Sequence, residues 1–181
     1  MDTADTGKRR FIIPALLFLL PLAALLWSDR PLLVSLVLYA NLYALALYDH
    51  FTFRLPNLLV ATLAVVGLLN AYLNAAHMAP YLIGLVAGFI ALAALALAYE
   101  KLRGRAGLGM GDAKFLGAAG AWVSWAGLPP VLLIASLAGL GGFLVKSVSS
   151  GRHNSAEPIP FGPFLCLGLW LVWLYFSPFD A

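Results

Sequence analysis

Long and almost uninterrupted apolar segments are the feature of this sequence that most restricts its fold. A helix needs about 20 mostly apolar residues to cross the hydrocarbon core of a bilayer. In lipid the backbone must satisfy its own hydrogen bonds, which favours helices over open sheets. Segments approaching the required length are 11–27, 32–48, 57–76, 80–99, 113–128, 130–148 and 161–178. We therefore predict an all-α polytopic membrane protein with seven transmembrane helices.

The composition agrees with a lipid environment and excludes other classes of protein. Of the 181 residues, 62% are hydrophobic and 10% are charged, whereas soluble domains have about 25% charged residues. The single cysteine, Cys166, excludes an internal disulfide framework and a zinc site of several cysteines. The net charge of +3 is too small for a nucleic-acid-binding surface. The bilayer is thus the first expected partner, and residues 1–181 form one membrane domain.

The positions of lysine and arginine predict the orientation, because these residues are enriched in cytoplasmic loops. If the N-terminus is cytoplasmic, seven crossings place 1–10, 49–56, 100–112 and 149–160 inside. Ten basic residues then lie inside or at flanking helix ends, and only Arg30 lies outside. The ten are Lys8, Arg9, Arg10, Arg54, Lys101, Arg103, Arg105, Lys114, Lys146 and Arg152. This asymmetry predicts a cytoplasmic N-terminus and supports the helix count.

Two aspartates stand out among the acidic residues. Asp49 closes the second predicted helix and Asp112 opens the fifth, so both are predicted at the same edge of the bilayer. Taken singly, Asp49 is explained as an interfacial residue, and Asp112 as an acid at a helix N-terminus. A carboxylate close to lipid is costly unless it is paired, solvated or protonated. Their common depth therefore favours a pair.

Paired carboxylates have a known use in peptide hydrolysis. Two like charges close together do not both ionise easily, so the pair shares one proton. The ionised member takes a proton from a water that attacks the scissile carbonyl, and the protonated member polarises that carbonyl. Which of Asp49 and Asp112 has which role stays open, because the titration belongs to the pair.

The residues around the aspartates indicate how their loops are built. Gly107, Gly109 and Gly111 alternate before the second aspartate, and glycine permits positive φ and close approach of another backbone. A flexible loop explains them equally simply. Pro56 predicts a break between the second and third helices, and Asn57 is a candidate N-cap for the third.

Three motifs occur in order along the chain. Asp49 is followed by Arg-Leu-Pro-Asn at 54–57, and 109–114 reads Gly-Met-Gly-Asp-Ala-Lys. Residues 158–163 read Pro-Ile-Pro-Phe-Gly-Pro and include Pro160 and Gly162. In this order they resemble the three signatures of prepilin peptidases, also called type IV leader peptidases, over roughly 50–180 of the chain.

The resemblance implies an aspartic endopeptidase of the inner membrane with Asp49 and Asp112 as its catalytic pair. It implies that prepilin-like precursors are the partners and that their leader peptides are cut at the cytoplasmic face. Larger family members carry an N-terminal methyltransferase region with paired C-x-x-C motifs, and this chain resembles the compact form, so methyl transfer is not expected. Residues 1–10 are then a cytoplasmic tail, 11–27 an extra first helix and 32–178 the peptidase core.

The remaining motif residues are candidates for substrate binding or for shaping the loops. Lys114 either pairs with an aspartate or extends its ammonium to the membrane surface. The histidines are scattered, so we expect neither a metal nor a cofactor. The full set of these candidates is Pro56, Asn57, Gly109, Gly111, Lys114, Pro160 and Gly162.

Small residues in the segment 130–148 indicate close helix packing. Gly139, Gly141 and Gly142 lie there. In lipid, small residues let two helix backbones approach closely. We therefore predict that this segment contacts another helix through its glycines.

Two other functions account for a pair of membrane acids. One is a presenilin-like protease, which uses a Pro-Ala-Leu element, and no such tripeptide lies between Asp112 and the C-terminus. The other is a transporter or assembly subunit that binds ions or protons, and the chain shows no evident inverted repeat in its support.

Overall fold

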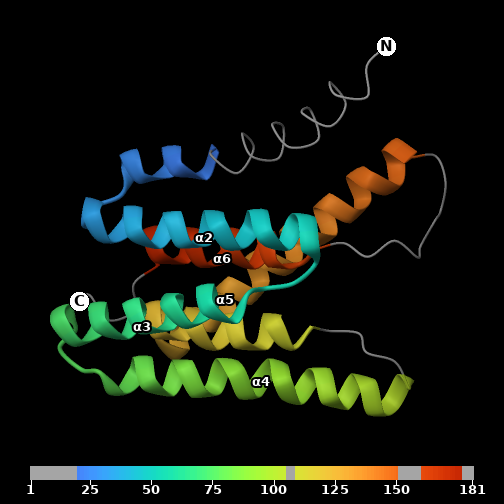
Figure 1. The fold of residues 1–181 in the computed structure, drawn as a ribbon. Helices are drawn as coiled ribbons and strands as arrows, with labels where there is room; N and C mark the ends of the chain where they lie inside the picture. The colour runs from blue at the N-terminus through green and yellow to red at the C-terminus, as the bar shows by residue number, and fades with distance from the viewer. Residues whose placement is uncertain (1–19, 105–108, 151–159, 177–181) are drawn as a thin grey trace.

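In the computed structural model, residues 20–104, 109–150 and 160–176 are described, and in these ranges all regular structure is helical. Figure 1 shows the helices lying side by side as a bundle. Four of them, α2, α3, α4 and most of α5, are long and apolar enough to cross a membrane. The prediction of an all-α membrane protein is thus confirmed. The elements are η1 Leu20–Trp27, α2 Leu32–Thr52, α3 Asn57–Asn74, α4 Ala79–Arg103, α5 Met110–Ser150 and α6 Gly162–Tyr175.

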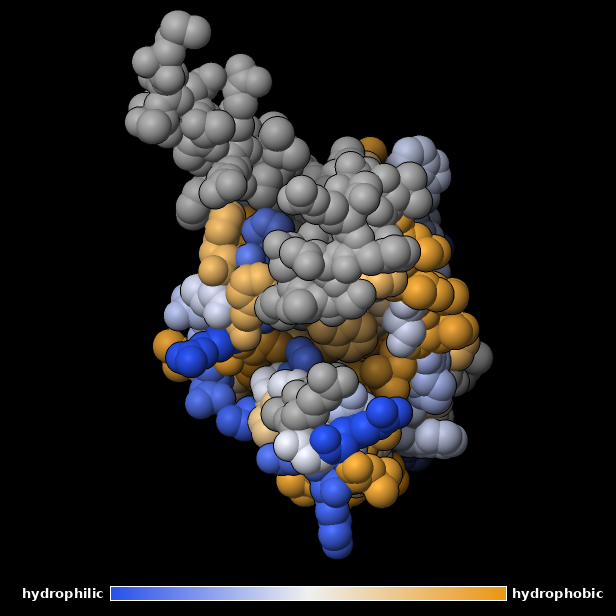
Figure 2. Space-filling model, turned by 90° about the vertical axis from the view of Figure 1, so that its right-hand side faces the viewer, coloured by the Kyte–Doolittle hydropathy of each residue, from blue (hydrophilic) through white to orange (hydrophobic). Residues whose placement is uncertain are grey.

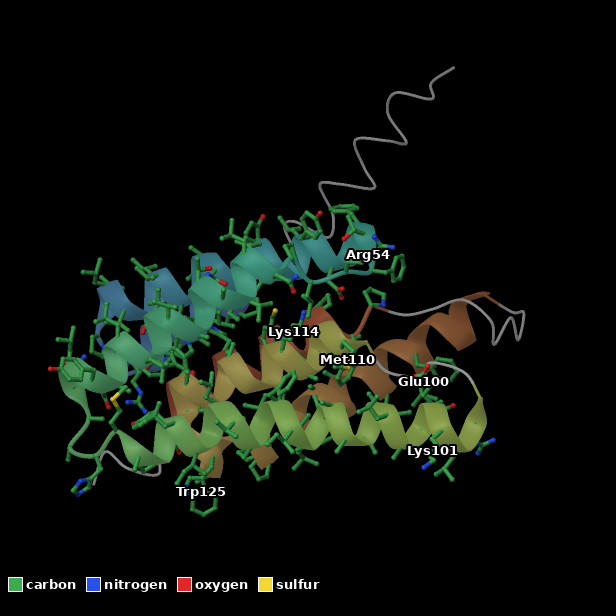
Figure 3. All side chains as sticks on the ribbon, turned by 60° about the horizontal axis from the view of Figure 1, so that its bottom comes forward. Arg54, Glu100, Lys101, Met110, Lys114 and Trp125 are labelled. Atoms are coloured by element: carbon green, nitrogen blue, oxygen red, sulfur yellow. The ribbon has the colours of Figure 1, made fainter. Side chains whose placement is uncertain are left out.

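Helix α5 consists of two helical halves joined by a reversal at Ser124. This residue has φ 60° and ψ −178°, and beyond it the chain turns back (Figures 1 and 3). The sequence placed the break between 128 and 130, and that position is wrong. Pro129 and Pro130 lie inside the second half, whereas the reversal comes from a backbone conformation that serine rarely adopts.

The first half of α5 packs closely against α4 through glycines on both helices. A Cβ at Gly84 would meet the carbonyl oxygen of Gly120 at 2.7 Å, and one at Gly88 would meet that of Leu116 at 2.6 Å. Such contacts bring two backbones together without intervening side chains. The first half of α5 therefore has a nearly fixed position beside α4.

The three glycines of the segment 130–148, which were predicted to pack against another helix, differ in their contacts. Gly139 and Gly142 lie against the ring of Phe164 in α6, with Cβ positions 3.5 Å and 3.0 Å from its atoms. A Cβ at Gly141 would have no neighbour within 4 Å. The prediction of close packing is therefore wrong for Gly141, which lies on the opposite side of this half-helix.

Other boundaries shift modestly. Helix α2 continues to Thr52, beyond the end of the predicted segment 32–48, and Asp49 lies in its last turn. The described part of the predicted first helix is a short 3₁₀ helix, η1. Several predicted features lie outside the described residues, namely the tail 1–10, the segment 11–19, Arg105, Gly107, Arg152, 158–159 and 177–178.

One end of the bundle gathers the charged loops. Figure 3 shows Arg54, Glu100, Lys101 and Met110 toward this end, with Trp125 toward the other. In a view of this end, hydrophilic residues lie at the left and lower centre and hydrophobic residues mainly on the right (Figure 2). The end of α2, the end of α4 and the start of α5 all lie toward this end. Gly111, which precedes Asp112, lies beside Leu55 of the loop that follows α2.

Candidate active site

Asp49 is held in the last turn of α2 and only 5% of its surface is exposed. Phe53 ends the helix in a left-handed conformation, φ 54°, and its N–H donates to the Asp49 carbonyl at 2.8 Å. The Thr52 hydroxyl donates to the carbonyl of Tyr48 at 2.8 Å. These local bonds end the helix one turn after the aspartate, whose side chain is buried in the bundle.

The loop after Asp49 reaches across to α5. Pro56 is the N-cap of α3, and the N–H of Val60 donates to its carbonyl at 3.1 Å. The prediction that Asn57 caps the helix is wrong, since Asn57 is the first helical residue. Its Oδ1 instead accepts a hydrogen bond from Lys114 Nζ at 2.9 Å. Lys114 therefore joins the first two motifs.

Asp112 lies in the first turn of α5 and is partly buried. Its own N–H donates to the carbonyl of Gly109 at 3.0 Å, and its Oδ2 lies 3.4 Å from the position of a Cβ at Gly109. A Cβ at Gly111 would lie 3.3 Å from Cβ of Leu55. Neither glycine has a positive φ, so both serve close approach rather than an unusual turn.

Gly162, the first residue of α6, makes the third contact of the site. Its N–H donates to Oδ2 of Asp49 at 3.0 Å. Pro160 lies two residues before this point and is partly buried. All three motifs thus converge on the same place, although they are more than 100 residues apart at the extremes.

The two carboxylates are close enough for the charge of Asp49 to act on Asp112. The buried thiol of Cys166 lies within electrostatic reach of both. Sequence reasoning did not include Cys166 or Leu55 among the site residues. The signal for Cys166 was its position four residues after Gly162, which places both on one face of α6.

A metal centre has no support in the described part of the chain, where no group of three His, Cys, Asp or Glu side chains comes together. The site offers the carboxylates of Asp49 and Asp112, the backbone N–H of Gly162 and the ammonium of Lys114, which is held by Asn57. Such a set can share a proton and activate water.

Comparison with known proteins gives a consistent result. The model of the type IV leader peptidase family matches residues 36–144. A prepilin leader peptidase/N-methyltransferase of Burkholderia pseudomallei is 38% identical over 157 residues, covering 86% of this chain and 50% of that protein. Proteins of the same name from Aeromonas hydrophila and Dickeya chrysanthemi are 37% and 38% identical, covering 79% and 81% of this chain.

The chain spans about half the length of these relatives, between 49% and 52% for the three named here. No solved structure matches the chain. The matched range includes both aspartates and both of their loops. Both aspartates therefore lie in the part of the chain that matches the family, whereas Gly162, which contacts Asp49, lies beyond the end of the matched range.

Proposed function

This chain belongs to the type IV leader peptidase family, and we propose that it is a membrane aspartic endopeptidase that removes the leader peptides of prepilin-like precursors. The observation that carries the proposal is the convergence of the loop after Asp49 with the start of α5 that bears Asp112: a Cβ at Gly111 would lie 3.3 Å from Leu55, and Lys114 donates to Asn57 at 2.9 Å. Family membership favours this function over a presenilin-like protease or a transporter.

The proposed reaction is a hydrolysis by the shared-proton mechanism. One carboxylate accepts a proton from a water molecule, whose oxygen forms a bond to the scissile carbonyl carbon. The other, protonated, carboxyl donates its proton to the carbonyl oxygen. When the C–N bond breaks, the amine leaves with a proton from the first carboxyl and the second regains its own, so one water is consumed for each peptide bond cut.

A direct test is to co-express the protein with a prepilin-like precursor and follow the shortened product. We expect Asp49→Ala and Asp112→Ala each to abolish cleavage while the protein is still inserted in the membrane. Asp29→Ala is a matched control, because Asp29 is an exposed acid that precedes α2, at the other end of the bundle. Cleavage that persists in either active-site variant would remove that residue from the mechanism.

We further propose that the site faces the cytoplasm. Support comes from the basic residues Arg54, Lys101 and Arg103 at the same end of the bundle and from the enrichment of such residues in cytoplasmic loops. Single cysteines at Phe53, Met110 and Trp27, introduced with the buried Cys166 retained, test the orientation. We expect labelling at 53 and 110 from the cytoplasmic side and at 27 from the opposite side. Labelling of 53 and 110 from opposite sides would reject the site itself.

A further inference from the structure

The start of α6 directs one backbone donor at Asp49. The first N–H groups of a helix have no partner within the helix. In α6, Pro163 has no N–H, and the N–H groups of Phe164 and Leu165 both donate to the carbonyl of Phe161 at 3.1 Å. The N–H of Gly162 remains, and it donates to Asp49 Oδ2 at 3.0 Å. The sequence Phe-Gly-Pro-Phe thus leaves one donor for the carboxylate.

The same position has no room for a side chain. A Cβ at Gly162 would lie 2.6 Å from Oδ2, 2.8 Å from Cγ and 3.0 Å from Cβ of Asp49. Distances below 3.0 Å require one of the groups to move, and Asp49 is the group that would have to do so. Because Asp49 is 5% exposed, its carboxylate has little free space into which to move.

We propose that Gly162 is a positioning residue, whose N–H and missing side chain together fix the Asp49 carboxylate for proton exchange with Asp112 and water. This inference rests on the proposed function. With Oδ2 held by Gly162, Oδ1 is the oxygen left for the reaction. The partial positive charge at the start of a helix favours a carboxylate at this place. The third motif then acts on the chemistry without touching the substrate.

The chain contains a matched control for the test in the same helix. A Cβ at Gly168 would meet the carbonyl oxygen of Val131 in α5 at 2.6 Å, so Gly168→Ala produces a steric conflict of equal closeness with backbone. Gly162→Ala conflicts with the carboxylate instead. Comparing the two separates positioning of Asp49 from general damage to α6.

The variants are purified in detergent, and cleavage of a prepilin-like precursor is measured together with the melting temperature. For Gly162→Ala we expect kcat to fall about tenfold to a hundredfold, because small displacements of reacting groups are costly. We expect KM to change little and the melting temperature to fall less than in Gly168→Ala, because the end of a side chain shifts more easily than backbone. For Gly168→Ala we expect a lower melting temperature and a kcat per folded molecule within about twofold of the wild type, since its conflict adds strain without moving a reacting group.

A spectroscopic readout makes the test independent of turnover. The infrared carboxyl band of Asp49, identified by its loss in Asp49→Asn, should shift in Gly162→Ala and stay in place in Gly168→Ala. A wild-type kcat in Gly162→Ala, or equal losses of kcat and melting temperature in both glycine variants, would overturn the positioning role. A wild type that cuts no precursor would reject the proposed function, whereas an unshifted Asp49 band in Gly162→Ala would reject only the role of Gly162.

Discussion

At the end of the bundle where α2 begins, Arg30 donates from Nε to the Trp173 carbonyl at 2.9 Å, and its guanidinium carbon lies 4.9 Å from the centre of the Trp173 ring. At the opposite end, Asp49 accepts the N–H of Gly162 at 3.0 Å. Both contacts tie a charged side chain to α6, one near each end of that helix. The difference is that a second carboxylate, Asp112, lies beside the second contact.

The comparison separates stabilisation from function. Placing a charge close to lipid costs free energy, and a partner lowers this cost. Arg30 has two partners, the carbonyl and the ring of Trp173. Two carboxylates brought together repel each other when both are ionised. Folding alone gives no reason to bury Asp49 and to place a second aspartate, Asp112, at the same end of the bundle, so this arrangement favours a functional role over a stabilising one.

The largest effect should come from replacing either aspartate by its amide. Asp49→Asn and Asp112→Asn keep the shape of the side chain but cannot exchange the proton, so we expect kcat to fall about a thousandfold or more. The melting temperature should stay at or above that of the wild type, because the repulsion is gone. The measurement is precursor cleavage and thermal unfolding of the same preparations. A variant that retains a tenth of the activity would contradict the shared-proton mechanism.

The next effect tests the scaffold rather than the chemistry. Gly120→Ala places a methyl group against the Gly84 backbone of α4, and overpacking of this kind typically costs about 1–3 kcal/mol. We expect a lower melting temperature with unchanged kcat per folded molecule. Gly141→Ala is the control, because a Cβ there has no neighbour within 4 Å. Equal melting temperatures in the two variants would show that the α4–α5 contact is looser than the structure indicates.

These contacts show what the sequence could and could not predict. The apolar segments predicted the helices, since lipid leaves the backbone few alternatives. The motif order predicted that Asp49, Asp112 and the 158–163 segment belong to one site, and the structure brings Asp49, Asp112 and Gly162 together. Their roles in catalysis stay predictions.

Contacts made by backbone groups were not predictable in the same way. The reversal at Ser124 depends on a single φ angle, whereas the apolar segments 113–128 and 130–148 placed the break later. The donor to Asp49 is the backbone N–H of Gly162. Almost every residue has such an N–H, so the sequence does not show which one will bind the carboxylate. The sequence predicted close helix packing at the glycines of 130–148. In the described residues, the closest approach at a glycine is instead between Gly84 and Gly120, which face each other from α4 and α5.

A smaller effect should follow from separating the first two motifs. Lys114→Met removes the 2.9 Å bond to Asn57 Oδ1, and we expect kcat/KM to fall about fivefold, equivalent to about 1 kcal/mol for one hydrogen bond. Asn57→Ala should give a similar loss, and the double variant should be no worse than either one. Additive losses would mean that Lys114 and Asn57 act separately, for instance with Lys114 acting on the substrate.

The smallest effect is expected at the other end of the bundle and completes the comparison. Arg30→Met keeps an unbranched apolar side chain but removes the donor to the Trp173 carbonyl and the cation above its ring. We expect the free energy of unfolding to fall by about 1 kcal/mol and both kcat and KM to stay at wild-type values. Thermal unfolding and cleavage of the same preparation measure the two quantities. If Arg30→Met lowered kcat without lowering the amount of folded protein, α6 would transmit a change from Trp173 to Gly162. The two ends of the bundle would then not be independent.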